Sequence, residues 1–319
     1  MYHVEFPGLG WEFTLNPVAF ELGGLTVRWY GILIAAGFLL ALLYVMKNAR
    51  RFGLNSDKLI DAVLVGLVTG LIGARLYYVI FYPGGKYINN PLLIFDITEG
   101  GFAIYGGIIG GILGGILVAK WRRQSIPAVL DIAVIGFLIG QGIGRWGNFM
   151  NQEAFGIETN LPWGMMSENT LLAAGSPVHP CFLYESLWCL IGVLALHWFS
   201  KRRRYDGQVF LLYLVWYGLE RGIVEGLRTD SLYIPGISLR VSQVLAFATA
   251  AIGLLLLVYF HMKKRNTLCV NTVASKGPDE PETITKPIVE SFDEENETQP
   301  DKTEIDGGAA KPSDPKSEE

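Results

Sequence analysis

The sequence predicts an all-α integral membrane protein with seven transmembrane helices, its N-terminus outside and its C-terminus in the cytoplasm. Half of the 319 residues are apolar, and glycine, which is frequent in membrane helices, occurs 38 times. Long apolar stretches end at clusters of Lys and Arg, whereas the segments between these clusters carry few such residues. Because loops rich in Lys and Arg stay on the cytoplasmic side, this alternation predicts both the spans and their orientation.

Seven apolar stretches each approach the ~20 residues that a helix needs to cross a bilayer. In chain order, the predicted spans are 26–46, 59–82, 102–119, 127–146, 181–199, 208–224 and 239–261. Basic clusters follow the first, third, fifth and seventh spans and begin at Lys47, Lys120, Lys201 and Lys263. The longest of the resulting outer segments, 147–180, is rich in Gly, Asn, Pro and Trp and is predicted to form a small outer cap.

The charge distribution divides the chain into a membrane domain, 1–268, and an acidic cytoplasmic tail, 269–319. From Lys276 to Glu319 the sequence has 14 acidic and 5 basic residues and no apolar periodicity. Such a segment cannot bury enough apolar surface to offset its conformational entropy, so the tail is predicted to be disordered. The three cysteines and four histidines lack the spacing of metal sites, so neither a metal nor another cofactor is expected.

Several charged side chains lie within or beside the predicted spans, where exposure to lipid is costly. They are Arg75 in the second span, Arg145 at the outer end of the fourth, Glu185 at the start of the fifth, Glu220, Arg221 and Glu225 in the outer half of the sixth, and Arg228 just beyond it. Charged residues at such depth usually face a bundle interior or an aqueous cavity. The group therefore predicts a polar chamber near the outer boundary of the membrane.

Two arginines in this group can each be interpreted in two ways. Tyr217, Arg221 and Glu225 share one helix face, which holds either an internal ion pair or the lining of a cavity for an anionic ligand. Arg145 either extends to the interface or directs its guanidinium group, together with Asn148 one turn on, at phosphate oxygens. Two arginines at the same boundary favour a bound phospholipid head group.

The third span repeats small residues from Gly106 to Gly115, a pattern typical of closely packed membrane helices. Tyr105 precedes this repeat at the depth predicted for Arg145 and Arg221. It is either an interfacial anchor or a reacting group.

One stretch of the chain resembles the signature of the prolipoprotein diacylglyceryl transferase family. Residues 144–156 read Gly-Arg-Trp-Gly-Asn-Phe-Met-Asn-Gln-Glu-Ala-Phe-Gly. Supporting stretches occur in the family's order at 28–31, 73–78, 179–185 and 217–221. The resemblance covers roughly residues 1–265, and seven spans with an outer N-terminus agree with it.

The resemblance implies an enzyme that moves the diacylglyceryl group of phosphatidylglycerol onto the thiol of the lipobox cysteine in a bacterial prolipoprotein. A thioether forms and glycerol phosphate leaves, at the outer face of the cytoplasmic membrane, in the first step of lipoprotein maturation. The implied partners are phosphatidylglycerol, prolipoprotein signal peptides with a lipobox cysteine and the lipid bilayer, with no nucleic acid.

The resemblance also implies roles for individual residues, carried over by position. Arg145 and Arg221 are expected to hold the lipid phosphate and to stabilise the charge that gathers on the leaving group. The expected catalytic residues are Arg145, Arg221, Tyr105 and Glu225. The expected substrate-binding residues are Tyr30, Arg75, Asn148, Asn151, Glu153, Gly156, Glu185 and Tyr217.

Tyr105 departs from the family pattern, which often reads His-Gly-Gly here and whose His has been proposed to activate the thiol. An unperturbed Tyr titrates near ~10 and a Cys near ~8.5, so a neutral phenol is a poor general base. Three interpretations remain open. Tyr105 donates a hydrogen bond, the two arginines acidify its phenol, or the base is elsewhere, such as Glu225 or a thiolate formed spontaneously. We expect the donor or orienting role.

Three other classes of protein fit the sequence less well. A transporter would carry polar groups through the full membrane depth, but here they concentrate near the outer boundary, although Arg75 lies deeper. A retinal-binding receptor needs a Lys in its last span, and 239–261 contains none. A scaffold without chemistry would leave the paired outer arginines and carboxylates without a purpose.

Overall fold

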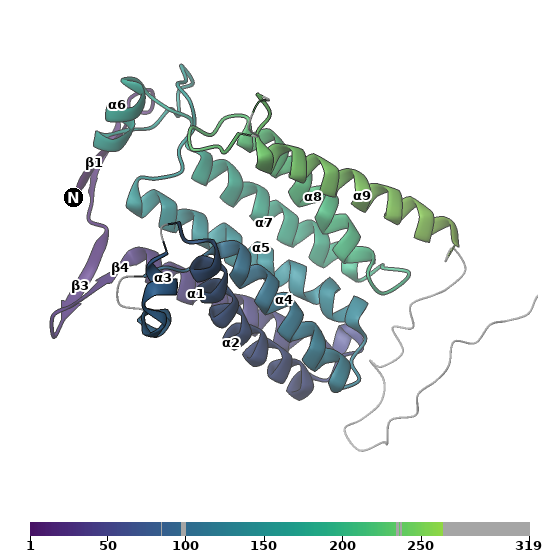
Figure 1. Ribbon diagram of the computed structural model, residues 1–319. Coiled ribbons are helices and arrows are strands. Elements are labelled where there is room, and N and C mark those ends of the chain that lie inside the picture. Colours follow the sequence, from purple (N-terminus) through teal and green to yellow (C-terminus); the bar gives the residue numbers. More distant parts are fainter. Residues whose placement is uncertain (84, 97–99, 234–235, 237, 264–319) are drawn as a thin grey trace, which may run out of the picture. The chain divides into compact units, whose positions relative to one another are not determined.

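The computed structural model describes residues 1–263 except 84, 97–99, 234–235 and 237, so the predicted tail, 269–319, lies outside the described residues. A long helix occupies each of the seven predicted spans (Figure 1). These helices are α1 (Trp29–Asn48), α2 (Ser56–Phe81), α4 (Ile104–Trp121), α5 (Ile126–Asn151), α7 (Cys181–Ser200), α8 (Gln208–Glu225) and α9 (Val241–Lys263). Shorter helical turns between them are η1 (Ala49–Phe52), α3 (Lys86–Asn89), η2 (Pro91–Phe95) and α6 (Glu168–Ala174).

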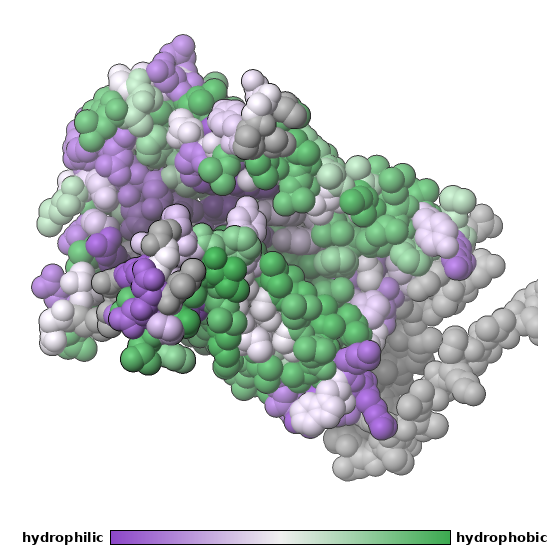
Figure 2. All heavy atoms as spheres, viewed as in Figure 1, coloured by the Kyte–Doolittle hydropathy of each residue, from purple (hydrophilic) through white to green (hydrophobic). Residues whose placement is uncertain are grey.

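Six of the long helices are long and apolar enough to cross a bilayer, so the chain is a multi-pass membrane protein. The exception is α8, whose 18 residues include the charged side chains of Glu220, Arg221 and Glu225. The number of spans and their orientation therefore stay predictions. Large apolar side chains cover the outside of the long helices (Figure 2), as a surface in contact with lipid requires.

Glycines bring the backbones of α2 and α4 into contact. A Cβ atom added to Gly106 would lie 2.2 Å from the carbonyl oxygen of Gly73, and one added to Gly110 would lie 2.3 Å from that of Thr69. The prediction that the glycines of the third span serve close helix packing is confirmed.

Two tryptophans hold α7 and α8 in register. Trp188 Nε1 donates to the carbonyl of Trp216 at 3.2 Å, Trp216 Nε1 donates to that of Trp188 at 3.3 Å, and the rings stack with centroids 4.5 Å apart. Gly192 leaves room for this pair, because a Cβ atom there would lie 2.5 Å from Trp216 Nε1. Sliding one helix along the other would break both hydrogen bonds.

The basic clusters that the structure describes meet at one end of the bundle. Arg51 donates to Ser200 Oγ at 2.9 Å, and Ser125 donates to Asp206 at 3.1 Å. Arg122 Nη2 lies 2.6 Å from Oδ2 of Asp61, near the start of α2. These contacts join the ends of α1, α4 and α7 to the starts of α2, α5 and α8, as the alternation of basic clusters predicts.

The opposite end carries two β-hairpins and the cap. β1 (Tyr2–Phe6) pairs antiparallel with β2 (Trp11–Leu15) and with β5 (Met166–Ser167), which gives the sheet order β2-β1-β5. A second hairpin consists of β3 (Val18–Leu22) and β4 (Leu25–Arg28). N-terminal residues therefore complete the cap predicted from 147–180. The cap also begins later than predicted, because α5 continues to Asn151.

The cap has an apolar core of its own beneath the hairpins. Buried side chains from β1, the end of α5, the cap segment and the start of α7 pack together, namely Val4, Phe6, Phe149, Met165, Val178 and Phe182. Hydrophilic residues gather over this end of the bundle (Figure 2). The cap is thus built around the last turns of α5, which carry the candidate site.

Gly106→Ala is expected to lower the free energy of unfolding by about 1–3 kcal/mol, because its methyl group would collide with the α2 backbone. Gly140→Ala is the matched control, since a Cβ atom at Gly140 meets nothing within 4 Å. Thermal melting of the purified variants in detergent measures the difference. Equal melting temperatures for the two variants would contradict the packing role of Gly106.

Candidate functional site

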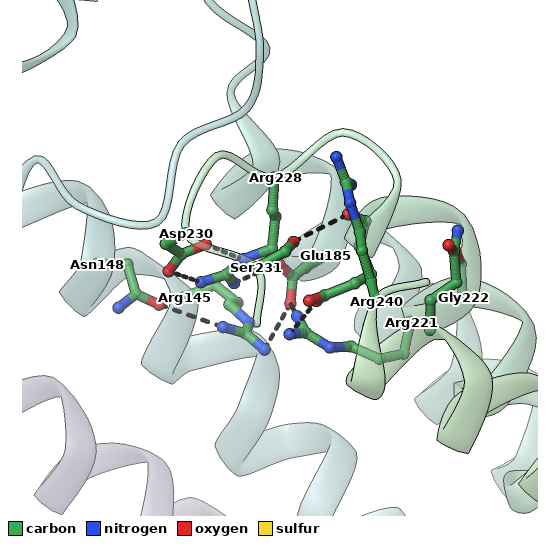
Figure 3. A network of polar contacts seen from close by, with 11 residues as sticks. Arg145, Asn148, Glu185, Arg221, Gly222, Arg228, Asp230, Ser231 and Arg240 are labelled. Carbon is green, nitrogen blue, oxygen red and sulfur yellow. Dashed lines mark hydrogen bonds and ion pairs between the residues drawn. The ribbon is translucent and has the colours of Figure 1, made fainter. Parts of the chain in front are cut away.

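A cluster of ionised side chains lies where α5 and α8 end and α7 begins (Figure 3). Arg145 belongs to the last turns of α5, Arg221 and Glu225 to the last turns of α8, and Glu185 to the second turn of α7. Because α7 runs opposite to α5 and α8, its first turns meet their last turns. The topology therefore brings residues from three separate predicted spans to the cap end of the bundle.

The carboxylate of Glu185 is the centre of this cluster. The residue is 2% exposed, and its Oε2 lies 2.5 Å from Arg145 Nη2 and 3.9 Å from Arg221 Nη1. Its Oε1 lies 3.5 Å from Nη1 of Arg228. Buried charges of this kind are tolerated only when they are paired. The structure thus brings the two predicted phosphate-binding arginines onto one carboxylate oxygen.

The polar face of α8 contains the ion pair that the spacing of Arg221 and Glu225 predicts. Arg221 pairs with Glu225 one turn on, and the same guanidinium group also faces Glu185. One turn before Arg221, Tyr217 stacks on Tyr213 with ring centroids 5.6 Å apart. The pair is therefore part of a larger cluster rather than an isolated contact within one helix.

The end of α5 adds a chain of amide hydrogen bonds. Arg145 Nη1 donates to Asn148 Oδ1 at 3.3 Å, and Asn148 Nδ2 donates to Glu153 Oε1 at 2.9 Å. Asn151 Nδ2 donates to the same oxygen at 3.4 Å. Gln152 ends the helix in the left-handed conformation, with φ 49°, so that Glu153 folds back toward Asn148.

Two glycines allow other segments to approach this helix end. The ring of Tyr30 lies against Gly147, where an added Cβ atom would be 2.7 Å from Tyr30 Cδ2. Gly156 donates its N–H to the carbonyl of His179 at 2.9 Å and forms an isolated antiparallel bridge with Arg228. Gly156 thus attaches the cap segment beside one of the cluster's arginines.

Four residues of the cluster were not among the predicted site residues. Arg228 donates to both carboxylate oxygens of Asp230, from Nε at 2.8 Å and from Nη2 at 2.6 Å. These two hydrogen bonds hold the pKa of the Asp230 carboxyl below its usual value. Arg240 Nη1 and Ser231 Oγ both donate to the backbone carbonyl of Glu225. Arg228 belonged to the charged group that predicts the polar chamber, although no binding role was assigned to it. Asp230 and Ser231 follow the sixth predicted span, and Arg240 begins the seventh, positions that also fit ordinary boundary or loop residues.

The arginine–carboxylate cluster joins arginines and carboxylates from α5, α7, α8 and the segment between α8 and α9. Its four arginines and three carboxylates are Arg145, Arg221, Arg228 and Arg240 with Glu185, Glu225 and Asp230. Guanidinium groups offer paired N–H donors that match phosphate oxygens, and they act strongly where water is scarce. The arginines of the cluster therefore offer N–H donors suited to an anionic group. Among the described residues, no group of three or more His, Cys, Asp or Glu side chains is placed to hold a metal.

The cap is fastened to α7 through Tyr184, next to Glu185. Trp163 Nε1 donates to the hydroxyl of Tyr184 at 2.8 Å, and that hydroxyl lies 3.1 Å from His179 Nδ1. Partial burial lowers the pKa of His179, so its neutral form is favoured. His179 Nδ1 and the Tyr184 hydroxyl form a hydrogen bond whose direction depends on the His179 tautomer, and the three side chains tie the cap to the helix that supplies the central carboxylate.

Tyr105 lies on the α2–α4 pair rather than in the arginine–carboxylate cluster. It is half exposed, and its ring centroid is 6.4 Å from that of Tyr77 on α2. Within the described part of the chain, no hydrogen bond or ion pair joins Tyr105 to Arg145 or Arg221. Its catalytic role stays a prediction.

Arg75 also lies outside the cluster, and its five N–H donors all face backbone carbonyls. They reach the oxygens of Leu93, Ile94, Asp96, Gly100 and Gly101. The residue is 8% exposed, so these carbonyls replace solvent for the buried guanidinium group. The predicted substrate-binding role of Arg75 is untested, and its contacts are those of an anchor for the segment between α2 and α4.

Comparisons with known proteins identify the family of the chain. A family model described as prolipoprotein diacylglyceryl transferase matches residues 17–259. A phosphatidylglycerol–prolipoprotein diacylglyceryl transferase of Clostridioides difficile is 41% identical over 254 residues, which are 80% of this chain and 99% of the relative. Proteins of the same name from Streptococcus agalactiae and Bacillus licheniformis are 44% and 42% identical, over 77% and 79% of this chain and 96% and 94% of their own lengths.

Arg75→Lys is expected to loosen residues 86–101, because three ammonium donors cannot satisfy five carbonyls. Limited proteolysis should cleave this segment several times faster than in the unchanged protein. The Michaelis constant for phosphatidylglycerol, the lipid in the relatives' names, should change little. Arg122→Lys, at an ion pair on the other end of α4, is the matched control. A raised Michaelis constant with unchanged proteolysis would instead assign Arg75 to substrate binding.

Proposed function

Because the chain belongs to the prolipoprotein diacylglyceryl transferase family, we propose that it transfers the diacylglyceryl group of phosphatidylglycerol to a prolipoprotein. The acceptor is the thiol of the lipobox cysteine, and glycerol phosphate is released in this first step of bacterial lipoprotein maturation. The observation that carries the proposal is the convergence of Arg145 and Arg221 on one buried carboxylate at the cap end of the bundle.

The cluster supports recognition of the lipid phosphate. Phosphatidylglycerol carries a negatively charged phosphodiester, whose oxygens match the N–H donors of the cluster's arginines. Arg145 and Arg221 each have five N–H donors, so each can keep its contact with Glu185 and still bind a phosphate oxygen. Asn148, Asn151 and Glu153 then lie beside the phosphate, where their amide and carboxylate groups suit the hydroxyls of a glycerol head group.

Three other predicted substrate-binding residues belong to or contact the elements that carry the cluster. Tyr30 packs on the end of α5, Gly156 attaches the cap beside Arg228, and Tyr217 precedes Arg221 by one turn. We propose that these residues shape the head-group site, with Glu225 keeping Arg221 oriented.

The chemistry is a substitution at the glyceryl carbon that bears the phosphate. The sulfur of the lipobox cysteine, as a thiolate, forms a bond to this carbon while the carbon–oxygen bond breaks. The oxygen leaves with the bonding electron pair, so a phosphodiester with one charge becomes a phosphomonoester with a second charge. Arg145 and Arg221 stabilise this developing charge, and such electrostatic assistance is often the largest catalytic contribution.

The position of the site supports access from the membrane. Trp146, next to Arg145, is 43% exposed, and its Nε1 donates to Ser186 Oγ at 3.0 Å, so the outer ends of α5 and α7 present an apolar side chain anchored by a polar contact. We propose seven spans in the bacterial cytoplasmic membrane, with the N-terminus and the active site toward the outer face. The clustering of the basic segments at the opposite end supports this orientation.

The direct test uses the purified full-length protein in vesicles of phosphatidylglycerol with a lipobox peptide. Release of glycerol phosphate and a peptide mass increased by one diacylglyceryl group are expected together. Vesicles of phosphatidylethanolamine, and a peptide with Ser in place of the lipobox Cys, are the negative controls. Absence of product with phosphatidylglycerol, or equal product from the Ser peptide, would overturn the proposal.

Arg145→Ala is expected to reduce the transfer rate at least about 100-fold, because the leaving phosphate loses a charged donor. Tyr105→Phe is expected to retain transfer within about tenfold of the unchanged enzyme, since an orienting hydroxyl contributes one hydrogen bond. Initial rates of glycerol phosphate release compare the variants, with melting temperatures confirming that both fold. Equal total loss in both folded variants would place Tyr105 in the chemistry.

Deletion of every residue after Thr267 is expected to leave the transfer rate unchanged, because the family match ends at residue 259. The same vesicle assay measures it, and membrane fractionation checks insertion. A truncated protein that inserts normally but has lost transfer would show that the acidic tail takes part.

A further inference from the structure

We propose that Asp131 and Arg240 are positioning residues that clamp α8 at its two ends and thereby hold Arg221 in the anion site. This inference rests on the proposed function. It concerns two residues that touch neither the expected lipid phosphate nor each other, and it explains how the least apolar of the long helices keeps its charged side chains in place.

The start of α8 lacks a capping side chain of its own. Its N-cap residue is Gly207, whose φ of 94° lies in the left-handed region, and no side chain from this segment caps the first turn. The first N–H groups of a helix have no partners within the helix and together carry a partial positive charge. Gln208 and Val209 at the start of α8 are buried, so these groups need an acceptor from elsewhere in the protein.

Asp131 of α5 supplies that acceptor. Its side chain is inaccessible to solvent, with Oδ2 accepting from the N–H of Gly207 at 2.9 Å and Oδ1 from that of Phe210 at 2.8 Å. Arg203 lies nearby, with Nε 3.9 Å from Oδ2. A carboxylate is thus fixed against the positive end of the α8 dipole by a neighbouring helix.

The other end of α8 is held by a cation. Arg240, directly before α9, donates through Nη1 to the backbone carbonyl of Glu225, the last residue of α8. Its Nε donates to the hydroxyl of Tyr233 at 3.3 Å, and Ser231 Oγ donates to the same Glu225 carbonyl at 3.3 Å. Figure 3 shows Arg240 and Ser231 in the same polar network as Arg221. The guanidinium group therefore complements the negative end of the helix dipole.

The two clamps fix where Arg221 meets Arg145. Asp131 and Arg145 lie on the same helix, so a bond from Asp131 to the start of α8 sets the axial position of α8 against α5. Phe210 and Arg221 are 11 residues apart, or about 16 Å along the helix axis. A shift of about 1 Å in α8 would carry Arg221 away from the phosphate, and displacements of this size can reduce rates by roughly 100-fold.

The test compares Asp131→Asn, Arg240→Gln and Arg240→Lys in the full-length protein. Two quantities are measured in phosphatidylglycerol vesicles: the maximal rate of transfer to a lipobox peptide, and the inhibition constant of added glycerol phosphate. Arg122→Gln is the matched control, because it breaks a charged contact of 2.6 Å with Asp61 that does not involve α8. Melting temperatures separate lost stability from lost positioning.

Asp131→Asn and Arg240→Gln are each expected to lower the rate and raise the inhibition constant by roughly tenfold or more, because Arg221 is displaced. Arg240→Lys keeps the positive charge and a donor for the Glu225 carbonyl, so its rate and inhibition constant should return most of the way to those of the unchanged protein. Arg122→Gln should leave the inhibition constant unchanged. If Asp131→Asn does not fold, the two Arg240 variants decide alone.

Folded Asp131→Asn and Arg240→Gln proteins with an unchanged inhibition constant would overturn the inference, as would an equal increase in Arg122→Gln. If the protein without any substitution shows no transfer, the proposed transferase function is refuted instead. The two failures are therefore distinguishable in one experiment.

Discussion

The burial of one carboxylate among three guanidinium groups is the constraint on which the candidate site depends. Glu185 is almost inaccessible to solvent, and Arg145, Arg221 and Arg228 surround its two oxygens. Without this negative charge, the three cations would repel one another in a medium of low dielectric constant. Without the arginines, the carboxylate would be an uncompensated buried charge. The helices that contribute to the site are therefore held together by these charges, and the geometry proposed to bind the anion is formed before any substrate arrives.

The sequence predicted the long helices well, because their signal is physical and local. An apolar stretch of bilayer length that ends at basic residues admits few structures, and the helices occupy all seven predicted spans. The strands of the N-terminal segment and the continuation of α5 to Asn151 were missed. The N-terminal strands are only four or five residues long, so their local signal is weak. The pairing of β1 with β5 also joins segments more than 150 residues apart in the sequence. Glycine and asparagine at 147–151 indicate a loop locally, but packing of the cap keeps this segment helical.

The candidate site was predictable in composition but only partly in assembly. Depth and helix spacing singled out Arg145, Glu185, Arg221 and Glu225, which do come together. The same rule selected Arg75, because a buried charge indicates either function or a structural role, and only three-dimensional contacts distinguish the two. Depth also placed Arg228 in the charged group that predicts the chamber, whereas Arg240 lies at the very start of the seventh predicted span, where a charge is ordinary for the membrane boundary. Nothing in the linear pattern reveals that the loop that carries them turns back onto the end of α8.

The composition of α8 has a consequence for how the chain is built into the membrane. A segment of 18 residues with Glu220, Arg221 and Glu225 near one end partitions into lipid less readily than its neighbours do. Gly218 lies against the Ala246 backbone on α9, and the tryptophan pair joins α8 to α7 on another side. During biosynthesis, therefore, α8 gains a stable place in the bilayer only together with these partners. If α8 crosses the bilayer as predicted, α7, α8 and α9 are therefore expected to insert together, with charge neutralisation and helix integration in one step.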